Sequence, residues 1–311
     1  MTHAAEPATV AVAPSSTRGS RRPLSALIQG WSLLLPAAVL LVIFTYYPVG
    51  ETIIDSLFST PKGRRAAVFV GADNYQAMLA DPVFWRALSN NLVYAACVIP
   101  LTIALALAMA LWVNGRIAGR PFLRLSYFTP TVLPMIAVAN IWLFFYAPGY
   151  GLLDQILGLF GISSHNWLGD GNTALACLIA VAVWKDAGFF MIFYLAALQQ
   201  MSVQLAEAAS IEGASRWYFF RRVTFPLLMP TTLFVLVNAI INSFRLIDHI
   251  VVMTQGGPDN TTALLLFYIY EVGFKYWDTA YAATLTVVLL ALLAVLALGQ
   301  FLALDRRIHY Q

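Results

Sequence analysis

Charged residues are scarce in this chain, and cysteine is nearly absent. Asp, Glu, Lys and Arg make up 11% of the 311 residues, whereas hydrophobic residues make up 60%. The mean hydropathy is +0.75, which lies well outside the range of soluble globular domains. The composition therefore excludes a soluble domain and predicts an integral membrane protein.

Several motifs of enzymes and metal proteins are missing. There is no Walker A sequence, no His-Glu-x-x-His sequence and no nucleophile elbow, and the four histidines lie far apart. Cys97 and Cys177, the only cysteines, lack metal-ligand spacing and both lie in apolar runs. We therefore expect no enzyme, no metal site and no cofactor in this chain. The net charge of +3 gives no indication of a nucleic-acid partner.

Long apolar runs are abundant. Only helices and closed barrels satisfy every backbone polar group in lipid, and no barrel pattern is present. We predict an all-α fold with six transmembrane helices in residues 23–311, preceded by a disordered cytoplasmic tail, residues 1–22. The predicted spans are residues 27–49, 88–113, 125–146, 173–198, 226–253 and 281–304.

The third predicted span contains Pro130 and Pro134. Prolines free backbone carbonyls and permit a bend. We expect a fixed kink there in preference to a moving hinge.

Arginine and lysine decide the orientation, because positive charge is retained on the cytoplasmic side. Placing the N-terminus inside leaves five basic residues in outer loops: Lys62, Arg64, Arg65, Arg86 and Lys275. It assigns eleven to the cytoplasm: Arg18, Arg21, Arg22, Arg116, Arg120, Arg124, Arg216, Arg221, Arg222, Arg306 and Arg307. Both termini and the loop 199–225 are therefore predicted to be cytoplasmic.

That cytoplasmic loop is polar between two apolar neighbours. Residues 202–212 predict a short helix with Ser202 as N-cap, which Gly213 ends, and Ser215 can cap the next turn. Pro226 suits the first turn of the following helix. Small alanines beside glutamates and arginines favour a docking element, and an amphipathic connector is the alternative.

Glu207-Ala208-Ala209, Gly213, Val223 and Pro226 have spacings similar to the EAA loop of membrane subunits of binding-protein-dependent ABC importers. Glu212 replaces the usual Asp, and Val223 and Phe225 replace the usual Ile and Leu. The resemblance implies a coupling helix that docks on an ATPase subunit. The residues that match its contact positions are Glu207, Ala208, Ala209, Ile211, Glu212, Gly213, Ala214 and Arg216.

The resemblance covers nearly the whole chain after the tail. FVGADNY, TVLPMIAVANIW, VAVWKD, SFRLIDHIVVMTQGGPDNTT and RRIHYQ look like sugar and glycerol-phosphate permease subunits of these importers. This implies the type I ABC importer permease fold in a bacterial cytoplasmic (inner) membrane. It also implies a second homologous permease, two ATP-binding subunits that carry ATP and Mg²⁺, and an extracytoplasmic solute-binding protein as partners.

Polar residues within the spans are candidates for the solute path, because ionisable groups there are costly and face a bundle interior or a wet cavity. In a continuous fifth helix, Asn238, Asn242, Arg245 and His249 would share one face, with Asp248 beside it. Trp184 and Lys185, next to Asp186, lie mid-way in the fourth span. The alternative for both groups is a structural polar seam between helices.

The sequence does not decide the identity of the solute. Trp184, Asn238 and Asn242 suit a sugar, oligosaccharide or polyol, whereas Arg245 or Lys185 would suit the phosphate of sn-glycerol 3-phosphate or a glycerophosphodiester. A secondary carrier or a channel is the alternative from another class. Dependence of transport on the ATPase partner separates these alternatives from an ABC importer subunit.

Overall fold

The computed structural model describes residues 24–61, 63, 65–115 and 119–305. The predicted tail, residues 1–22, lies outside the described residues. So do eight of the basic residues used for the orientation: Arg18, Arg21, Arg22, Lys62, Arg64, Arg116, Arg306 and Arg307. The chain divides into two compact units, residues 1–51 and 52–311.

The described residues of the first unit form a single apolar helical stretch. It consists of α1 (Leu24–Leu41), the π-helical turn η1 (Val42–Tyr46) and the start of α2 (Tyr47–Asp55). Trp31–Asp55 is long and apolar enough to cross a membrane. Residues 31–49 are all exposed, and an apolar surface all around a helix is typical of a membrane span.

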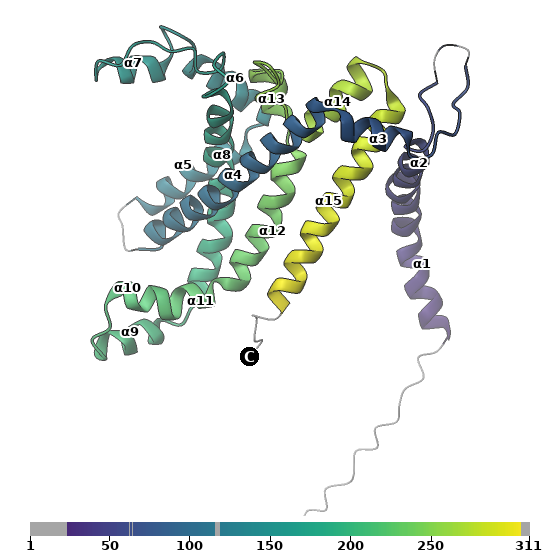
Figure 1. Cartoon of the computed structure of the whole chain (residues 1–311). Coiled ribbons are helices and arrows are strands. Elements are labelled where there is room, and N and C mark those ends of the chain that lie inside the picture. The colour runs from purple at the N-terminus through teal and green to yellow at the C-terminus, as the bar shows by residue number, and fades with distance from the viewer. Residues whose placement is uncertain (1–23, 62, 64, 116–118, 306–311) are drawn as a thin grey trace, which may run out of the picture. The chain divides into compact units, whose positions relative to one another are not determined.

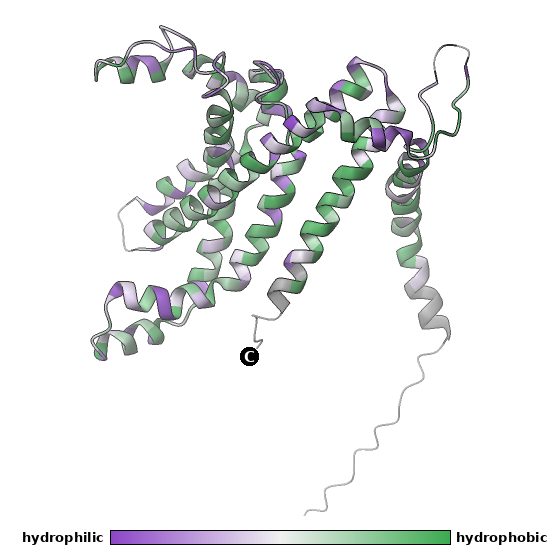
Figure 2. Cartoon of the chain, in the orientation of Figure 1, coloured by the Kyte–Doolittle hydropathy of each residue, from purple (hydrophilic) through white to green (hydrophobic). Residues whose placement is uncertain are grey.

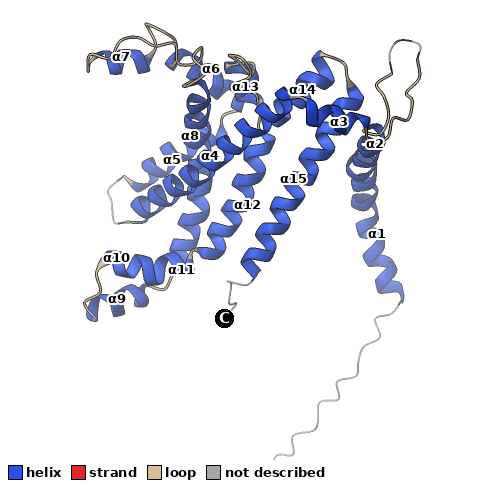
Figure 3. Ribbon diagram, in the orientation of Figure 1, coloured by secondary structure: helices blue, strands red, loops and turns tan. Residues whose placement is uncertain are grey.

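The second unit is also helical (Figures 1 and 3). Its described helices are α3 (Asp73–Ala80), α4 (Pro82–Asn114), α5 (Arg120–Val132), α6 (Met135–Phe145), α7 (Leu152–Gly158), α8 (Ala174–Gln200), α9 (Val203–Ile211), α10 (Arg216–Phe219), η2 (Phe220–Thr224), α11 (Phe225–Leu227), α12 (Met229–Arg245), α13 (Asp248–Met253), α14 (Leu265–Tyr270), η3 (Glu271–Lys275) and α15 (Thr279–Asp305).

Four stretches of this unit have the length and composition of spans: Pro82–Asn114, Ala174–Gln200, Met229–Met253 and Thr279–Gln300. α5 and α6 together add another if the pair counts as one span. Figure 2 shows the apolar residues that dominate these helices. With Trp31–Asp55, the described residues contain five or six candidate spans, and the predicted all-α membrane class is confirmed.

The third predicted span is broken and not merely kinked. α5 and α6 meet at an angle of 103°. Leu133 between them is extended, with φ −73° and ψ 137°, because a residue that precedes proline is sterically driven out of the helical region. Pro134 also lacks the N–H that would bond the Pro130 carbonyl in a continuous helix. Pro134 therefore divides this span into two helices, whereas Pro130 lies inside α5.

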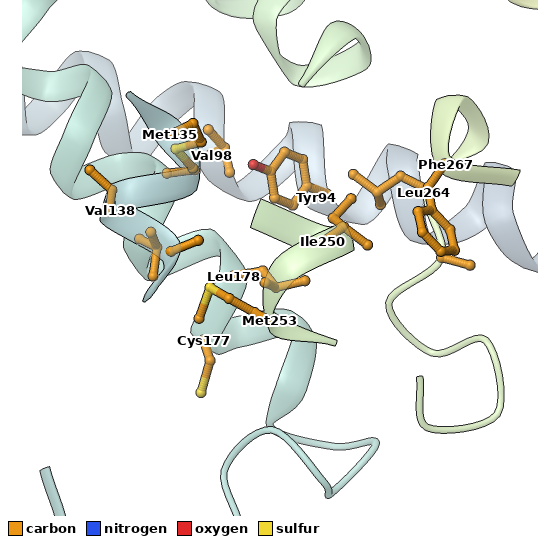
Figure 4. Close-up of a cluster of buried hydrophobic side chains, with 14 of the residues drawn as sticks. Tyr94, Val98, Met135, Val138, Cys177, Leu178, Ile250, Met253, Leu264 and Phe267 are labelled. Atoms are coloured by element: carbon orange, nitrogen blue, oxygen red, sulfur yellow. The ribbon is translucent and has the colours of Figure 1, made fainter. Parts of the chain in front are cut away.

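The core is built around α8. Its N-terminal half packs with α6, α13 and the residues before α14, as the labelled side chains Met135, Leu178, Ile250 and Leu264 show (Figure 4). Its C-terminal half packs with α4 and α12, where Ala106 and Ala110 are fully buried. Small side chains let helices approach closely in a membrane. α8 thus runs through both clusters before the chain enters α9.

Several short helices lie at two ends of this unit. In Figure 1, α3, α13 and α14 lie at one end, and α9 and α10 lie at the other. The charge pattern predicts that the α9 end is cytoplasmic. In this arrangement α9 and α10 lie away from α3 and α14, which belong to loops predicted to lie outside.

At the end of this unit opposite α9, Asp81 connects three helices. Its carboxylate caps α4 by accepting from the Val83 amide at 2.8 Å. It also accepts the hydroxyls of Tyr268 at 2.6 Å and Tyr281 at 2.7 Å. Burial alone would raise the pKa of Asp81, but these hydrogen bonds outweigh it and lower the pKa. α4, α14 and α15 are thereby tied together at this end.

Candidate coupling segment and solute path

The helix α9, which the charge pattern predicts to be cytoplasmic, ends in a Schellman motif at Gly213. Gly213 has φ +70°, and its N–H donates to the Ser210 carbonyl at 3.2 Å. The next N–H, of Ala214, donates to the Ala209 carbonyl at 2.9 Å. Glycine is favoured here because it adopts a left-handed conformation without steric cost. At the other end Ser202 occupies the N-cap position, but its side chain makes no capping hydrogen bond.

A second short helix follows the turn. Ser215 caps α10 by accepting from the Tyr218 amide at 3.2 Å. The chain then passes through η2 and α11, whose second residue is Pro226. The predicted order of helix, break and helix is present, and the chain returns to the membrane through α12.

Neither α9 nor α10 contributes a buried residue. We call residues 203–222 the coupling segment. Several of its large apolar side chains are uncovered: Ile211 is 86% exposed and Trp217 is 68% exposed. Clustered apolar exposure at the end of a molecule indicates a surface that a partner covers.

The residues that match the contact positions of the coupling helix are half-buried or exposed, and none is buried. Ala209 and Ala214 are half-buried. The others are exposed: Glu207, Ala208, Ile211, Glu212, Gly213 and Arg216. Beside them, Ser215, Trp217, Tyr218, Arg221, Arg222 and Pro226 line a hollow of about 720 Å³. Acidic, basic and apolar groups thus face outward on one short segment.

The predicted polar face of the fifth span does not continue to His249, which corrects the sequence analysis. α12 ends at Arg245, Leu246 is extended, and α13 begins at Asp248. His249 is fully buried, with its Nε2 3.1 Å from the Tyr94 hydroxyl. Neither proline nor glycine lies at this break, so the sequence carried no signal for it. His249 packs in the helix core instead of facing a solute.

The other polar residues of this region are accessible. Asn238 and Asn242 are half-buried, and Arg245 and Asp248 are exposed. The amide of Asn238 donates to the Phe234 carbonyl of its own helix at 2.7 Å. The ion pairs among the described residues do not include Arg245 or Asp248. Both charges are free to meet water or a ligand.

Trp184 lies in apolar surroundings. Its ring is 5.6 Å from that of Trp142 in an edge-on arrangement. With Cys97, Leu101, Ala104, Val183 and other apolar residues, it lines a hollow between α4 and α8. A tryptophan face of this kind can stack on a sugar ring or on another helix.

Lys185 contacts the chain at the break between α5 and α6. Its ammonium donates to the carbonyls of Pro130, Thr131 and Leu133, at 3.2, 3.4 and 2.7 Å. These carbonyls lack ordinary helix partners because α5 ends there. Leaving a buried carbonyl unpaired costs about 1–3 kcal/mol. The structure therefore uses Lys185 as a cap, a role that the sequence analysis did not assign.

A second missed feature is Asp154 at the start of α7. Its carboxylate accepts from the Ser164 hydroxyl at 2.5 Å, the Gly149 amide at 2.8 Å and the Trp167 indole at 2.6 Å. These hydrogen bonds, the one from Ser164 first, lower the pKa of Asp154 to about 2. Asp154 therefore organises the loop between α6 and α8, and it remains charged at neutral pH.

Among the described residues, no cluster of His, Cys, Asp and Glu could hold a metal ion. Cys97 and Cys177 are free thiols. The polar side chains described above form hydrogen bonds to backbone groups, as Lys185 does, or to other side chains, as Asp154 does.

Comparison with known proteins decides the family. Residues 102–310 match the family described as "Binding-protein-dependent transport system inner membrane component". The chain belongs to this family. It is therefore a multi-pass inner-membrane permease component of an ABC importer and not itself catalytic, and ATP is hydrolysed on partner subunits.

Relatives named for the transport of sugars or of glycerol phosphate align with most of the chain. The lactose transport system permease protein LacF of Rhizobium radiobacter is 32% identical over 90% of this chain and 95% of that protein. The sn-glycerol-3-phosphate transport system permease protein UgpA of Agrobacterium fabrum is 31% identical over 91% and 97%. The trehalose/maltose transport system permease protein MalF of Thermococcus litoralis is 33% identical over 88% and 94%.

A solved structure shares the fold. A chain of a bacterial ABC transporter involved in the import of the acidic polysaccharide alginate has a TM-score of 0.82 at 22% identity, covering 93% of this chain and 100% of that chain. The resemblance stated from the sequence is confirmed by the family match. The permease belongs to the sugar and glycerol-phosphate group of importers, which work with a binding protein.

Proposed function

We propose that residues 203–222 of this permease dock on an ATP-binding subunit and convert its closure into movement of the spans. The observation that carries the proposal is the exposure of α9 and α10 at the end opposite α3, α13 and α14. Exposed Ile211 and Trp217 provide apolar contact area, while Glu207, Glu212 and Arg216 provide charges around it.

The partners follow from this role. A second homologous permease completes the translocation path, two ATP-binding subunits carry ATP and Mg²⁺, and an extracytoplasmic binding protein delivers the solute. Closure of the ATP-binding subunits displaces the coupling segment, and the spans change from inward-open to outward-open. A secondary carrier or a channel would transport without the ATP-binding subunits, so loss of uptake when they are omitted from reconstituted vesicles excludes both.

We propose a sugar, oligosaccharide or polyol as the solute. Lactose and trehalose/maltose in the names of relatives support this class, and Trp184, Asn238 and Asn242 provide an aromatic face and amides of the kind that bind sugars. The exposed Arg245, without an ion pair among the described residues, supports sn-glycerol 3-phosphate as the second candidate.

Arg245→Gln separates the two solute classes. For a neutral solute we expect uptake to stay within roughly twofold of the parent, because an exposed residue outside the binding contacts contributes little. The measurement is radiolabelled uptake by vesicles that hold the complete transporter. The solute to use is the one that most raises the melting temperature of the cognate binding protein in a panel of sugars, polyols and glycerol 3-phosphate.

Asn238→Ala serves as the matched variant, and it should lower uptake of a neutral sugar more than Arg245→Gln does. Loss of uptake in Arg245→Gln, together with a binding protein that responds to glycerol 3-phosphate alone, would contradict the sugar proposal and support the second candidate.

A further inference from the structure

The ammonium of Lys185 has no donor left for a solute. A lysine ammonium carries three N–H donors, and Lys185 lies within hydrogen-bond distance of the carbonyls of Pro130, Thr131 and Leu133. All three acceptors belong to the end of α5 or to the residue that follows it. The charge of Lys185 is therefore directed at the break in the third span.

Two further contacts join α5 to α8 at the same level. The Thr131 hydroxyl donates back to the Lys185 carbonyl at 3.3 Å. Three residues further along α8, Gly188 lies so close to α5 that a Cβ there would be 1.9 Å from the Tyr127 carbonyl oxygen. We call the contacts of Lys185 and Gly188 with residues 127–133 the clasp.

The clasp is directly connected to the coupling segment. α8 runs without interruption from Ala174 to Gln200, and only Met201 and Ser202 separate it from α9. Between the clasp and α9, α8 is held by the buried side chains of Phe190, Met191 and Tyr194. A displacement of α9 therefore reaches the level of Lys185 through one continuous, packed helix.

We propose that Lys185 is a positioning residue that holds the third span in its broken form and fastens α5 to α8, so that α5 follows each displacement of the coupling segment. The proposal rests on the proposed coupling role of residues 203–222 and adds to it a residue that positions the third span. It requires that the α5–α6 angle is kept throughout the transport cycle, and it removes Lys185 from the residues that bind the solute.

Pairs of spin labels test whether this part of the permease stays rigid. In the assembled transporter, with Cys97 and Cys177 replaced by alanine, one pair is placed at the exposed residues Leu125 of α5 and Ile192 of α8. A second pair, at Leu125 and Ile141, spans the break. We expect both distance distributions to stay the same in the nucleotide-free and the ATP-trapped transporter, and to broaden in Lys185→Met.

Uptake and ATP hydrolysis are measured on the same samples. Lys185→Met should lose uptake while the complex remains assembled and still hydrolyses ATP, because α5 no longer follows α8. Lys185→Arg, which keeps the charge and several donors, should restore narrow distributions and most of the uptake. Lys185→Gln, which keeps two donors without the charge, should be intermediate in both measurements and provides a second variant if Lys185→Met does not assemble.

Three results would overturn the proposal. The first is a change in either distance between the two states of the parent transporter. The second is loss of uptake in Lys185→Met or Lys185→Gln with narrow, unchanged distributions, which would return Lys185 to the solute path. The third is a Lys185 variant with broad distance distributions that still shows full uptake. A transporter that takes up solute without any ATP-binding subunit would instead contradict the proposed function, so the two failures are distinguishable.

Discussion

Gly213→Val is expected to lower ATP-driven uptake by about tenfold or more, while leaving the amount of permease in the membrane unchanged. Gly213 has φ +70°, a conformation that costs an L-residue roughly 1–2 kcal/mol and a β-branched residue more. The Schellman turn between α9 and α10 would rearrange, and a 1.4 kcal/mol penalty on the docked form corresponds to a factor of ten. The measurement is initial uptake rate per transporter in reconstituted vesicles.

Gly213→Asn is the matched control, because asparagine tolerates the left-handed region. A Cβ at position 213 meets nothing within 4 Å, so side-chain size alone has no effect within this chain. Asparagine should therefore retain most of the uptake. Equal loss in both variants would show that a side chain at position 213 obstructs the partner and that the backbone turn is not the cause.

Gly188→Ala is expected to destabilise the transporter by about 3 kcal/mol, the upper end of the usual range for overpacking. The added Cβ would lie 1.9 Å from the Tyr127 carbonyl oxygen. That atom is backbone and cannot rotate away, so α5 and α8 must separate and the contacts of Lys185 with α5 are lost. The measurement is the thermal unfolding of the purified complex in detergent.

Gly299→Ala is the corresponding control on α15. A Cβ at Gly299 meets nothing within 4 Å, and alanine is about 1 kcal/mol better than glycine inside a helix. We expect an unchanged or slightly higher melting temperature for this variant. A similar melting temperature for Gly188→Ala and Gly299→Ala would mean that α5 and α8 are not in close contact in the assembled transporter.

Local chemistry made the coupling segment predictable. The left-handed glycine at 213, the serine cap at 215 and the position of Pro226 depend on neighbours within a few residues, so their sequence pattern is sufficient. The long apolar runs likewise predicted helical spans, since lipid leaves few alternatives for the backbone. Pro130 and Pro134 indicated a distortion in the third span but not its size.

Long-range contacts were not predictable in this way. Lys185 reaches carbonyls more than fifty residues away, and Asp81 meets the hydroxyl of Tyr281 across most of the chain. The interruption of the fifth span at Leu246 depends on packing, because no proline or glycine marks it. The sequence analysis therefore placed His249 on the same helix face as Asn238 and Asn242, whereas in the structure it belongs to a separate helix, α13.

Site-specific photo-crosslinking at Ala208 tests the coupling role most directly. A benzoyl-phenylalanine at this exposed position of α9 should capture the ATP-binding subunit, whereas the same probe at Leu159, which is exposed at the end of α7, should not. Failure to capture that subunit from Ala208 in an assembled transporter, or labelling of a cysteine at 208 only from outside the cell, would contradict the account.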